Sequence, residues 1–155
     1  MLDLLDEFSK LTRALDARGV EYAVCGGLAL AVYGIPRATI EIDLLIDAES
    51  LALVEIVAAE LGYRFAAAPM SFKGGAVQIR RVSKIDSGSG DVLMLDLLLV
   101  TAAVEAAWAG RIRVPWFDST VCVVSRAGLI ELKSLRGSGQ DQDDIRKLEE
   151  LDDEA

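Results

Sequence analysis

The chain has 155 residues, a net charge of −9, a hydrophobic fraction of 52% and no histidine. This length predicts one domain, over residues 1–155, that buries a sizeable core. The absence of histidine excludes an imidazole base and the usual zinc sites, and the negative charge argues against a broad surface for duplex DNA.

The first elements in the chain are a helix, a short strand and a glycine turn. Apolar spacing predicts a helix from about Leu2 to Arg18, and the apolar run from Tyr22 to Cys25 predicts a buried strand. Gly26 and Gly27 then let the backbone turn into a helix that ends near Tyr33. Backbone N–H groups at this turn would receive an anion such as a triphosphate; a strand-to-helix turn without a ligand is the alternative.

The next strand carries two acids on one face. The run from Ile40 to Ile46 is apolar and rich in isoleucine, and a period of two places Glu41 and Asp43 on the same side. Like charges held this close repel each other unless a cation lies between them, and magnesium accepts carboxylate oxygens together with phosphates. The pair therefore predicts a magnesium site, with an edge strand that has one wet face as the alternative.

A third acid lies in a later strand. A helix is expected over Ala48–Leu61, and strands over Gly75–Val82 and Val92–Leu99 joined by a turn rich in glycine and serine. Asp96 stands inside the second of these apolar runs, where a lone carboxylate is unfavourable. With the two earlier acids it forms a candidate two-metal site for phosphoryl transfer, unless it is an acid at a strand end that pairs with an arginine.

The last third of the chain predicts further helices and strands. Thr101–Ala109 favours a helix, residues 111–124 favour two short strands broken at Pro115, and Ser125 is placed to cap the next helix. A final acidic helix is expected from about Asp141 to Leu151. The order of elements therefore predicts a mixed α+β fold with a central sheet.

Basic residues gather in the middle of the chain, at Arg80, Arg81, Lys84, Arg111 and Arg113. If they line a cleft beside the carboxylates, they would receive a polyanion such as RNA. Otherwise they belong to a solvated strand face. The sequence leaves both interpretations open.

Three features bear on the location of the protein. The first seven residues hold three acids, unlike a secretion signal. The longest apolar run, residues 92–109, is interrupted by Asp96 and Glu105 and fits a strand and a helix better than a membrane span. Cys25 and Cys122 lie in apolar runs that suit reduced core thiols. We therefore expect a cytoplasmic protein without membrane partners.

Taken together, the apolar strand, the Gly-Gly turn, the helix, Pro-Arg-x-Thr, acid-x-Asp and the later strand aspartate resemble a known family. They are similar to the minimal nucleotidyltransferases of the DNA polymerase β-like superfamily, and most of all to the AbiEii-type toxin branch. The C-terminal segments Leu129–Lys133, Arg136 and Asp141–Ile145 continue the likeness, which spans roughly residues 20–150.

This resemblance implies a nucleotidyltransferase fold with a core of about residues 20–124 and a C-terminal helical segment of about 125–152. It implies the following site residues: Gly26 and Gly27 hold the nucleotide phosphates, Glu41, Asp43 and Asp96 bind two Mg²⁺ or Mn²⁺ ions and are catalytic, and Lys133 and Asp144 lie near the nucleotide. Arg37 and Thr39 either position a phosphate or end the loop before the strand.

The implied reaction moves a nucleoside monophosphate from a nucleoside triphosphate to a hydroxyl of RNA, of a protein or of a small molecule. A toxin-like role with an antitoxin partner follows from the same resemblance. In the family the first acid is normally aspartate, and the extra methylene of Glu41 moves its carboxylate by about one bond length, against the strict octahedral geometry of magnesium. Two alternatives therefore stay open: a catalytically weak or inactive nucleotide-binding or interaction module with the same fold, and a structural dimerising domain.

Overall fold

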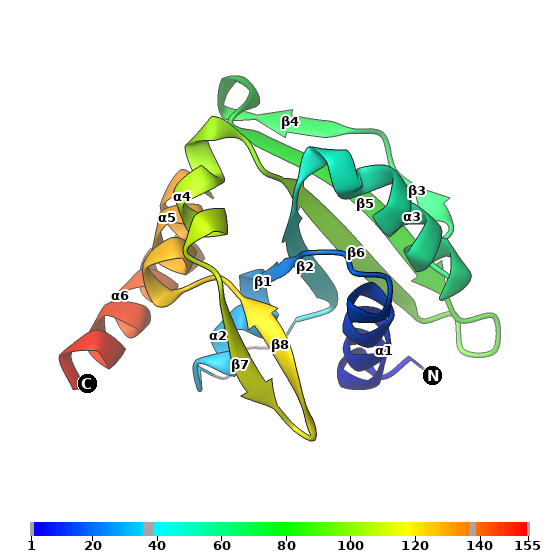
Figure 1. The fold of residues 1–155 in the computed structure, drawn as a ribbon, viewed down its shortest axis with the longest axis horizontal. Helices are drawn as coiled ribbons and strands as arrows, with labels where there is room; N and C mark the ends of the chain where they lie inside the picture. The colour runs from blue at the N-terminus through cyan, green and yellow to red at the C-terminus, as the bar shows by residue number, and fades with distance from the viewer. Residues whose placement is uncertain (1, 36–38, 137–138, 155) are drawn as a thin grey trace.

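The computed structural model describes residues 2–35, 39–136 and 139–154. They form an eight-stranded mixed sheet with helices on both of its faces (Figure 1). This architecture confirms the predicted α+β class with a central mixed sheet flanked by helices.

The helices and strands have the following bounds. The helices are α1 (Leu4–Ala17), α2 (Gly26–Val32), α3 (Leu51–Glu60), α4 (Glu105–Ala109), α5 (Arg126–Arg136) and α6 (Gly139–Glu154), with short 3-10 turns at Ala48–Ser50, Lys73–Gly75 and Ala102–Val104. The strands are β1 (Ala23–Cys25), β2 (Glu41–Ile46), β3 (Phe65–Ala66), β4 (Met70–Phe72), β5 (Val77–Ile85), β6 (Val92–Leu99), β7 (Ile112–Trp116) and β8 (Ser119–Val123).

The sheet places two central strands next to each other although they are far apart in the sequence. Its order is β3-β5-β6-β2-β1-β8-β7, and β4 pairs with β5. The pairs β2–β6 and β1–β8 are parallel, whereas the other pairs are antiparallel. The acid-bearing strand β2 therefore lies directly beside β6, the strand of Asp96.

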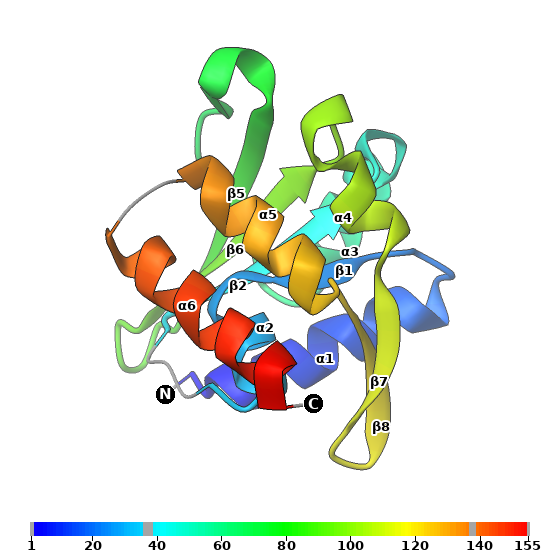
Figure 2. The same cartoon turned by 90° about the vertical axis from the view of Figure 1, so that its left-hand side faces the viewer.

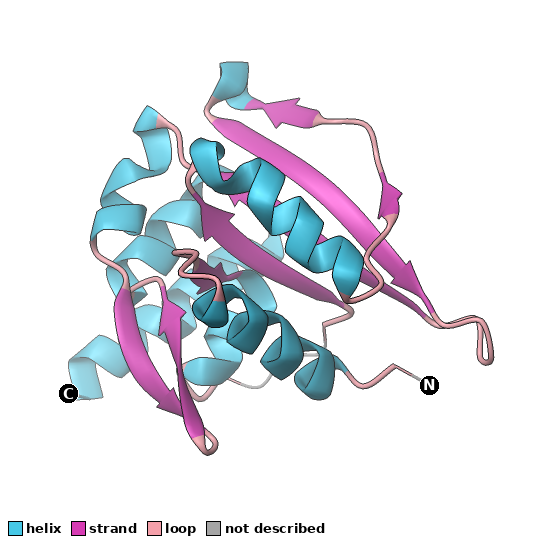
Figure 3. Cartoon of the chain, turned by 45° about the vertical axis from the view of Figure 1, so that its right-hand side comes forward, coloured by secondary structure: helices cyan, strands magenta, loops and turns pink. Residues whose placement is uncertain are grey.

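The two faces of the sheet have different coverings. Helices α1 and α3 lie side by side over one face, as Figure 3 shows. Helices α5 and α6 lie over the opposite face, with α2 and α4 beside them (Figure 2). In β2, Ile42 and Leu44 are fully buried, whereas Glu41 and Asp43 are half-buried and line a cavity with residues of α5. The predicted alternation along this strand is thus confirmed.

Helix α1 shows why the sequence folds locally as it does. The Asp3 carboxylate caps its first turn by accepting a hydrogen bond from the Asp6 backbone N–H at 3.0 Å. Phe8, Leu11 and Leu15 recur at helical spacing and are fully buried. The helix therefore packs its apolar stripe into the main core.

Several boundaries differ from the predictions. Strands β3 and β4 were not predicted, because Phe65 and Phe72 are half exposed and these short segments gain their order only by pairing with β5. The predicted break at Pro115 is wrong: Pro115 lies inside β7 and pairs with Thr120. Strand β7 is at the edge of the sheet, where a missing N–H is tolerated.

Other predictions agree closely with the structure. The Ser125 hydroxyl accepts a hydrogen bond from the Gly128 backbone N–H at 3.0 Å and so caps α5 as expected. Cys25 and Cys122 are free thiols, and Cys25 is buried. In the described part of the chain, the helices are too short or too polar to cross a membrane.

A buried tyrosine makes the stability of the fold depend on pH in the alkaline range. Tyr22 is 1% exposed, and burial raises its pKa from 10.0 to about 12. The pKa of Tyr22 in the folded protein lies above its value in the unfolded chain. The contribution of the protonated Tyr22 to the stability of the fold is therefore complete below pH 10 and is lost as the pH rises through 12.

Tyr22→Phe removes the titrating hydroxyl, so it should reduce the loss of stability between these two pH values by roughly 2–3 kcal/mol. Urea unfolding of both proteins across that interval measures the difference. An equal loss in the two proteins would contradict the assignment.

Candidate active site

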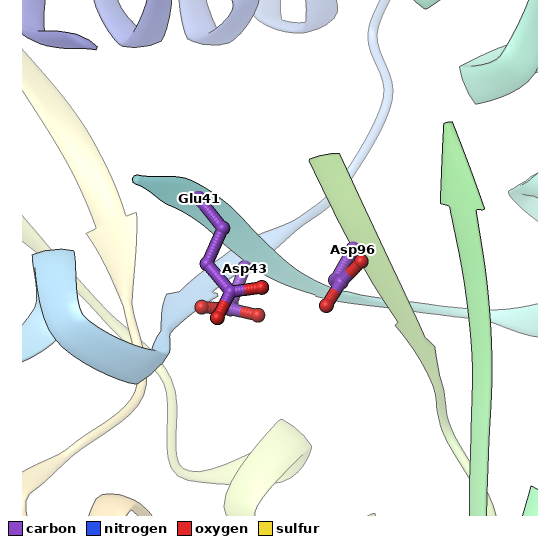
Figure 4. Close-up of side chains that lie close together, drawn as sticks. All are labelled: Glu41, Asp43 and Asp96. Carbon is purple, nitrogen blue, oxygen red and sulfur yellow. The ribbon is translucent and has the colours of Figure 1, made fainter. Parts of the chain in front are cut away.

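The register of four neighbouring strands brings the predicted acids together. Cys25 is opposite Asp43, Asp43 is opposite Asp96, and Asp96 is opposite Arg81. Glu41 lies two residues before Asp43 on the same face of β2. Each of the three acids offers a carboxylate oxygen, and these oxygens lie within 4.8 Å of one another (Figure 4). The sequence therefore predicted a real cluster.

The acid cluster opens into a cavity of about 470 Å³ between the sheet and α5. Its apolar walls come from β4, β5 and β6, from α5 and from the 3-10 turn before α4. These apolar residues are Met70, Phe72, Val77, Ile79, Leu98, Val104, Leu129, Leu132 and Leu135. The polar lining residues are the three acids, Lys73, Arg81, Lys133 and Asp141, and the turn residues Cys25 and Gly26 complete the wall. The cavity thus has charged side chains within a lining that is apolar over most of its surface.

The glycine turn lies directly against this cluster. Gly26 has a φ of +66°, and a Cβ atom placed on it would lie 2.2 Å from Asp43 Oδ2. A Cβ atom on Gly27 would lie 3.0 Å from the Cβ of Thr39. Close approach therefore requires glycine at position 26 and leaves little space for a side chain at position 27, and the turn brings backbone next to the acids as the sequence predicted.

Gly26→Ala should displace the Asp43 carboxylate, because the new methyl group occupies its position. Gly19→Ala is the matched control: Gly19 has a φ of +67° but nothing within 4 Å of the added atom. Both variants should lose roughly 1–2 kcal/mol from the left-handed backbone, and only Gly26→Ala should also weaken Mn²⁺ binding. Thermal melting and Mn²⁺ titration check this, and equal Mn²⁺ affinity in both variants would show that the turn does not position Asp43.

Thr39 has a structural role in the turn region. Its hydroxyl donates to the Glu41 carbonyl at 3.2 Å and accepts from the Glu41 N–H at 3.3 Å. Thr39 therefore fixes the start of β2, one of its two predicted roles. Arg37, the other residue predicted between the glycines and the acids, lies outside the described residues.

An arginine that was not predicted as a site residue contacts the cluster. Arg81 Nε donates to Asp96 Oδ1 at 2.6 Å, and Arg81 Nη2 donates to Asp96 Oδ2 at 2.8 Å and to Glu41 Oε2 at 3.3 Å. The hydrogen bonds to Asp96 raise the pKa of Arg81. The alternative to a metal ligand was an acid at a strand end that pairs with an arginine. Asp96 does pair with an arginine, but it lies in the middle of β6 and not at its end.

The sequence did contain a signal for this pair. The turn between β5 and β6 begins after Ile85, which is opposite Val92. Arg81 lies four residues before Ile85, and Asp96 lies four residues after Val92. The two residues are therefore opposite each other in the antiparallel hairpin, with their side chains on the same face. The register would have been needed to find it.

Lys133 and two acids form a second charged cluster at the cavity wall. Lys133 is 2% exposed, and its Nζ lies 3.4 Å from Asp141 Oδ1 and 3.2 Å from Asp144 Oδ2. Both acids are 1% exposed. The structure therefore makes Lys133 a buried ion-pair residue rather than a surface lysine, and it joins α5 to α6.

The basic residues in the middle of the chain do not form a basic cleft. Arg81 lines the cavity, whereas Lys84 pairs with Glu7 at 2.8 Å on the other face of β5. Arg111 pairs with the exposed Glu21 and lies over the Trp108 ring, and Arg113 pairs with Asp16. The interpretation of ordinary strand-face residues therefore holds for most of them.

Comparison with known proteins finds similar structures but no similar sequences. No family model and no curated protein matches the sequence. TM1012 of Thermotoga maritima, assigned as a nucleotidyltransferase, shares 16% identity and superposes with a TM-score of 0.57 over 97% of this chain and 91% of its own. The antibiotic-resistance factor ANT(2'')-Ia is also 16% identical. Its solution structure superposes with a TM-score of 0.65 over 94% of this chain and 82% of its own. Its crystal structure with adenylyl-2''-tobramycin superposes with a TM-score of 0.65 over 91% of this chain and 84% of its own.

The chain has the nucleotidyltransferase fold. At this level of identity the likeness establishes the fold and leaves the activity to be argued from the site. The fold agrees with the one that the resemblance of the sequence motifs implies, whereas the superfamily and its AbiEii branch stay predictions.

Proposed function

We propose that the protein is a metal-dependent nucleotidyltransferase, which moves a nucleoside monophosphate from a nucleoside triphosphate to a hydroxyl group. The observation that carries this proposal is the cluster of Glu41, Asp43 and Asp96 on neighbouring strands of a nucleotidyltransferase fold. Asp43 and Asp96 are opposite each other on β2 and β6, Glu41 lies on the same face of β2 as Asp43, and all three acids line the cavity.

The three acids fit a divalent ion such as Mg²⁺ or Mn²⁺. Their carboxylate oxygens are the hard ligands that these ions prefer. The oxygens lie within 4.8 Å of one another, so small side-chain movements would bring them to a shared ion. A bound ion would neutralise charge on the transferred phosphoryl group and lower the pKa of the attacking hydroxyl. Glu41, one methylene longer than aspartate, would reach the same ion from further along the strand.

The remaining tasks fall to other residues of the cavity. The turn at Gly26 and Gly27 offers backbone N–H groups beside the acids, where the nucleotide phosphates would lie. Apolar side chains such as Phe72, Ile79 and Leu132 offer surface for a planar base. Lys133 and Asp144, tied together in the wall, would position α5 and α6 against the nucleotide.

The acceptor hydroxyl belongs to RNA, to a protein or to a small molecule. The ANT(2'')-Ia structure with adenylyl-2''-tobramycin is a precedent for a small-molecule acceptor in this fold. The resemblance to AbiEii-type toxins supports a macromolecular acceptor and an antitoxin partner. These classes can be separated in one experiment.

The purified protein would be incubated with each common nucleoside triphosphate, Mg²⁺ or Mn²⁺, and the RNA, protein or small-molecule fraction of a cell extract. We expect pyrophosphate release with one fraction, and none with Asp43→Ala. Pyrophosphate release that stays at the level of the variant for every fraction would refute the proposal.

A nucleotide-binding module without turnover is the second candidate. Two points favour it: Glu41 stands where the family that the sequence resembles normally has aspartate, and Asp96 already has a cationic partner in Arg81. Metal-dependent nucleotide binding without any release of pyrophosphate would support this candidate.

A further inference from the structure

A guanidinium group lies where a metal ion would bind. Arg81 uses two nitrogens to contact both carboxylate oxygens of Asp96, and Nη2 also reaches Glu41. This is the bidentate geometry in which arginine recognises carboxylates most strongly. The negative charge of the cluster is therefore already partly balanced by a residue of the same chain.

A metal ion and Arg81 cannot both keep their best contacts with these acids. Magnesium requires ligand oxygens at about 2.0–2.1 Å in a near-octahedral arrangement. Both oxygens of Asp96 are engaged by Arg81, at 2.6 and 2.8 Å. A divalent ion held among the same carboxylates would lie close to the guanidinium, and like charges at that separation repel. The two cations therefore compete for Asp96 and Glu41.

Arg81 also has space and a second possible partner. Its side chain is 33% exposed and lines the cavity in which the nucleotide phosphates would lie. A guanidinium keeps its charge at any working pH, and its fork of N–H groups fits phosphate as well as carboxylate. A short movement of this long side chain would exchange one anionic partner for another.

We propose that binding of the divalent metal displaces Arg81 from Asp96, and that the released guanidinium then binds the phosphates of the incoming nucleotide. Arg81 thereby couples the two binding events, so that the nucleotide phosphates are held well only when the metal is present. This inference rests on the proposed function, since it concerns the same site.

The coupling predicts opposite effects on the two ligands. Without the competing guanidinium, the acids should bind the metal more tightly in the absence of nucleotide. Without the released guanidinium, the metal-loaded protein should bind phosphates more weakly. Couplings between ligands of one site are commonly about 5- to 150-fold, so we expect changes of roughly tenfold in each direction. A merely structural arginine would weaken both or neither.

The test uses Arg81→Gln, with Arg80→Gln as the matched control. Arg80 precedes Arg81 on β5 and points to the opposite face, so its loss removes the same charge without touching the acids. Mn²⁺ affinity would be measured by calorimetry without nucleotide, and affinity for inorganic tripolyphosphate would be measured with Mn²⁺ saturating. Arg81→Lys, which keeps the charge but not the fork, should lie between the wild type and Arg81→Gln.

The expected result is tighter Mn²⁺ binding and weaker tripolyphosphate binding in Arg81→Gln, with neither change in Arg80→Gln. Equal or weaker Mn²⁺ binding in Arg81→Gln and in Arg81→Lys would overturn the inference, and pyrophosphate release by the wild type would then show that the proposed function survives. If the wild type and all variants fail to bind Mn²⁺, both the inference and the proposed function are refuted.

Discussion

Asp43→Asn is expected to lower the rate of nucleotidyl transfer by roughly 10²–10³-fold, the range found when one preorganised electrostatic group is removed from an active site. Asp43 lies at the centre of the cluster, next to Asp96 on β6 and two residues from Glu41 on β2. The amide has nearly the same shape as the carboxylate, so packing against Gly26 is preserved while a metal ligand with negative charge is lost.

Asp47→Asn is the control for this change. Asp47 follows the same strand immediately after Ile46, and it is not among the residues that line the cavity. We expect its transfer rate to stay near that of the wild type. Initial rates at saturating Mg²⁺ measure both variants, and similar rates for Asp43→Asn and the wild type would exclude Asp43 from the chemistry.

Lys133→Met is expected to destabilise the fold by about 3–5 kcal/mol, the typical effect of removing one partner from a buried ion pair. The lysine is 2% exposed and faces two carboxylates that are each 1% exposed, on Asp141 and Asp144. Methionine fills a similar volume, so the loss arises because two buried charges no longer have this cation. Urea unfolding of the variant and the wild type measures the difference.

A triple variant separates charge from shape in this cluster. Lys133→Met combined with Asp141→Asn and Asp144→Asn removes all three charges, and we expect it to recover a large part of the stability lost in Lys133→Met alone. If the triple variant is less stable than the single one, hydrogen bonding by the two acids, rather than their charge, holds α6 in place.

The acid cluster could be predicted because its signal is local. Alternation along β2 places Glu41 and Asp43 on one face, and an aspartate inside the apolar run of β6 requires a polar partner. The glycine turn is likewise local, and its close approach to Asp43 explains why a glycine stands at position 26. These features depend only on neighbouring residues and on the period of the strand.

The partners of the charged residues could not be predicted in the same way. Arg81 meets Asp96 through a hairpin register, and Lys133 meets Asp141 and Asp144 across the connection between α5 and α6. A lysine on an amphipathic helix has no local feature that distinguishes a buried side chain from an exposed one. Such contacts are set by how elements pack, so they required the structure.

The predictions for three of the strands, β3, β4 and β7, were wrong for a related reason. Strands β3 and β4 are two and three residues long and carry exposed phenylalanines, so they lack the alternation that marks a half-buried strand. Pro115 marks a break only in a central strand, and the sequence alone does not place β7 at an edge. In both cases the position in the sheet overrides local propensity.

The most direct test of nucleotidyl transfer follows the two ends of the nucleotide. The protein would be incubated with Mg²⁺, the active extract fraction and a nucleoside triphosphate labelled either at the α or at the γ phosphate. We predict that the α label appears on the acceptor and that the γ label appears in pyrophosphate, and that Asp43→Asn slows the appearance of both labels to the same extent. Transfer of the γ label to the acceptor, or hydrolysis that releases only inorganic phosphate, would contradict the assignment of this site to nucleotidyl transfer.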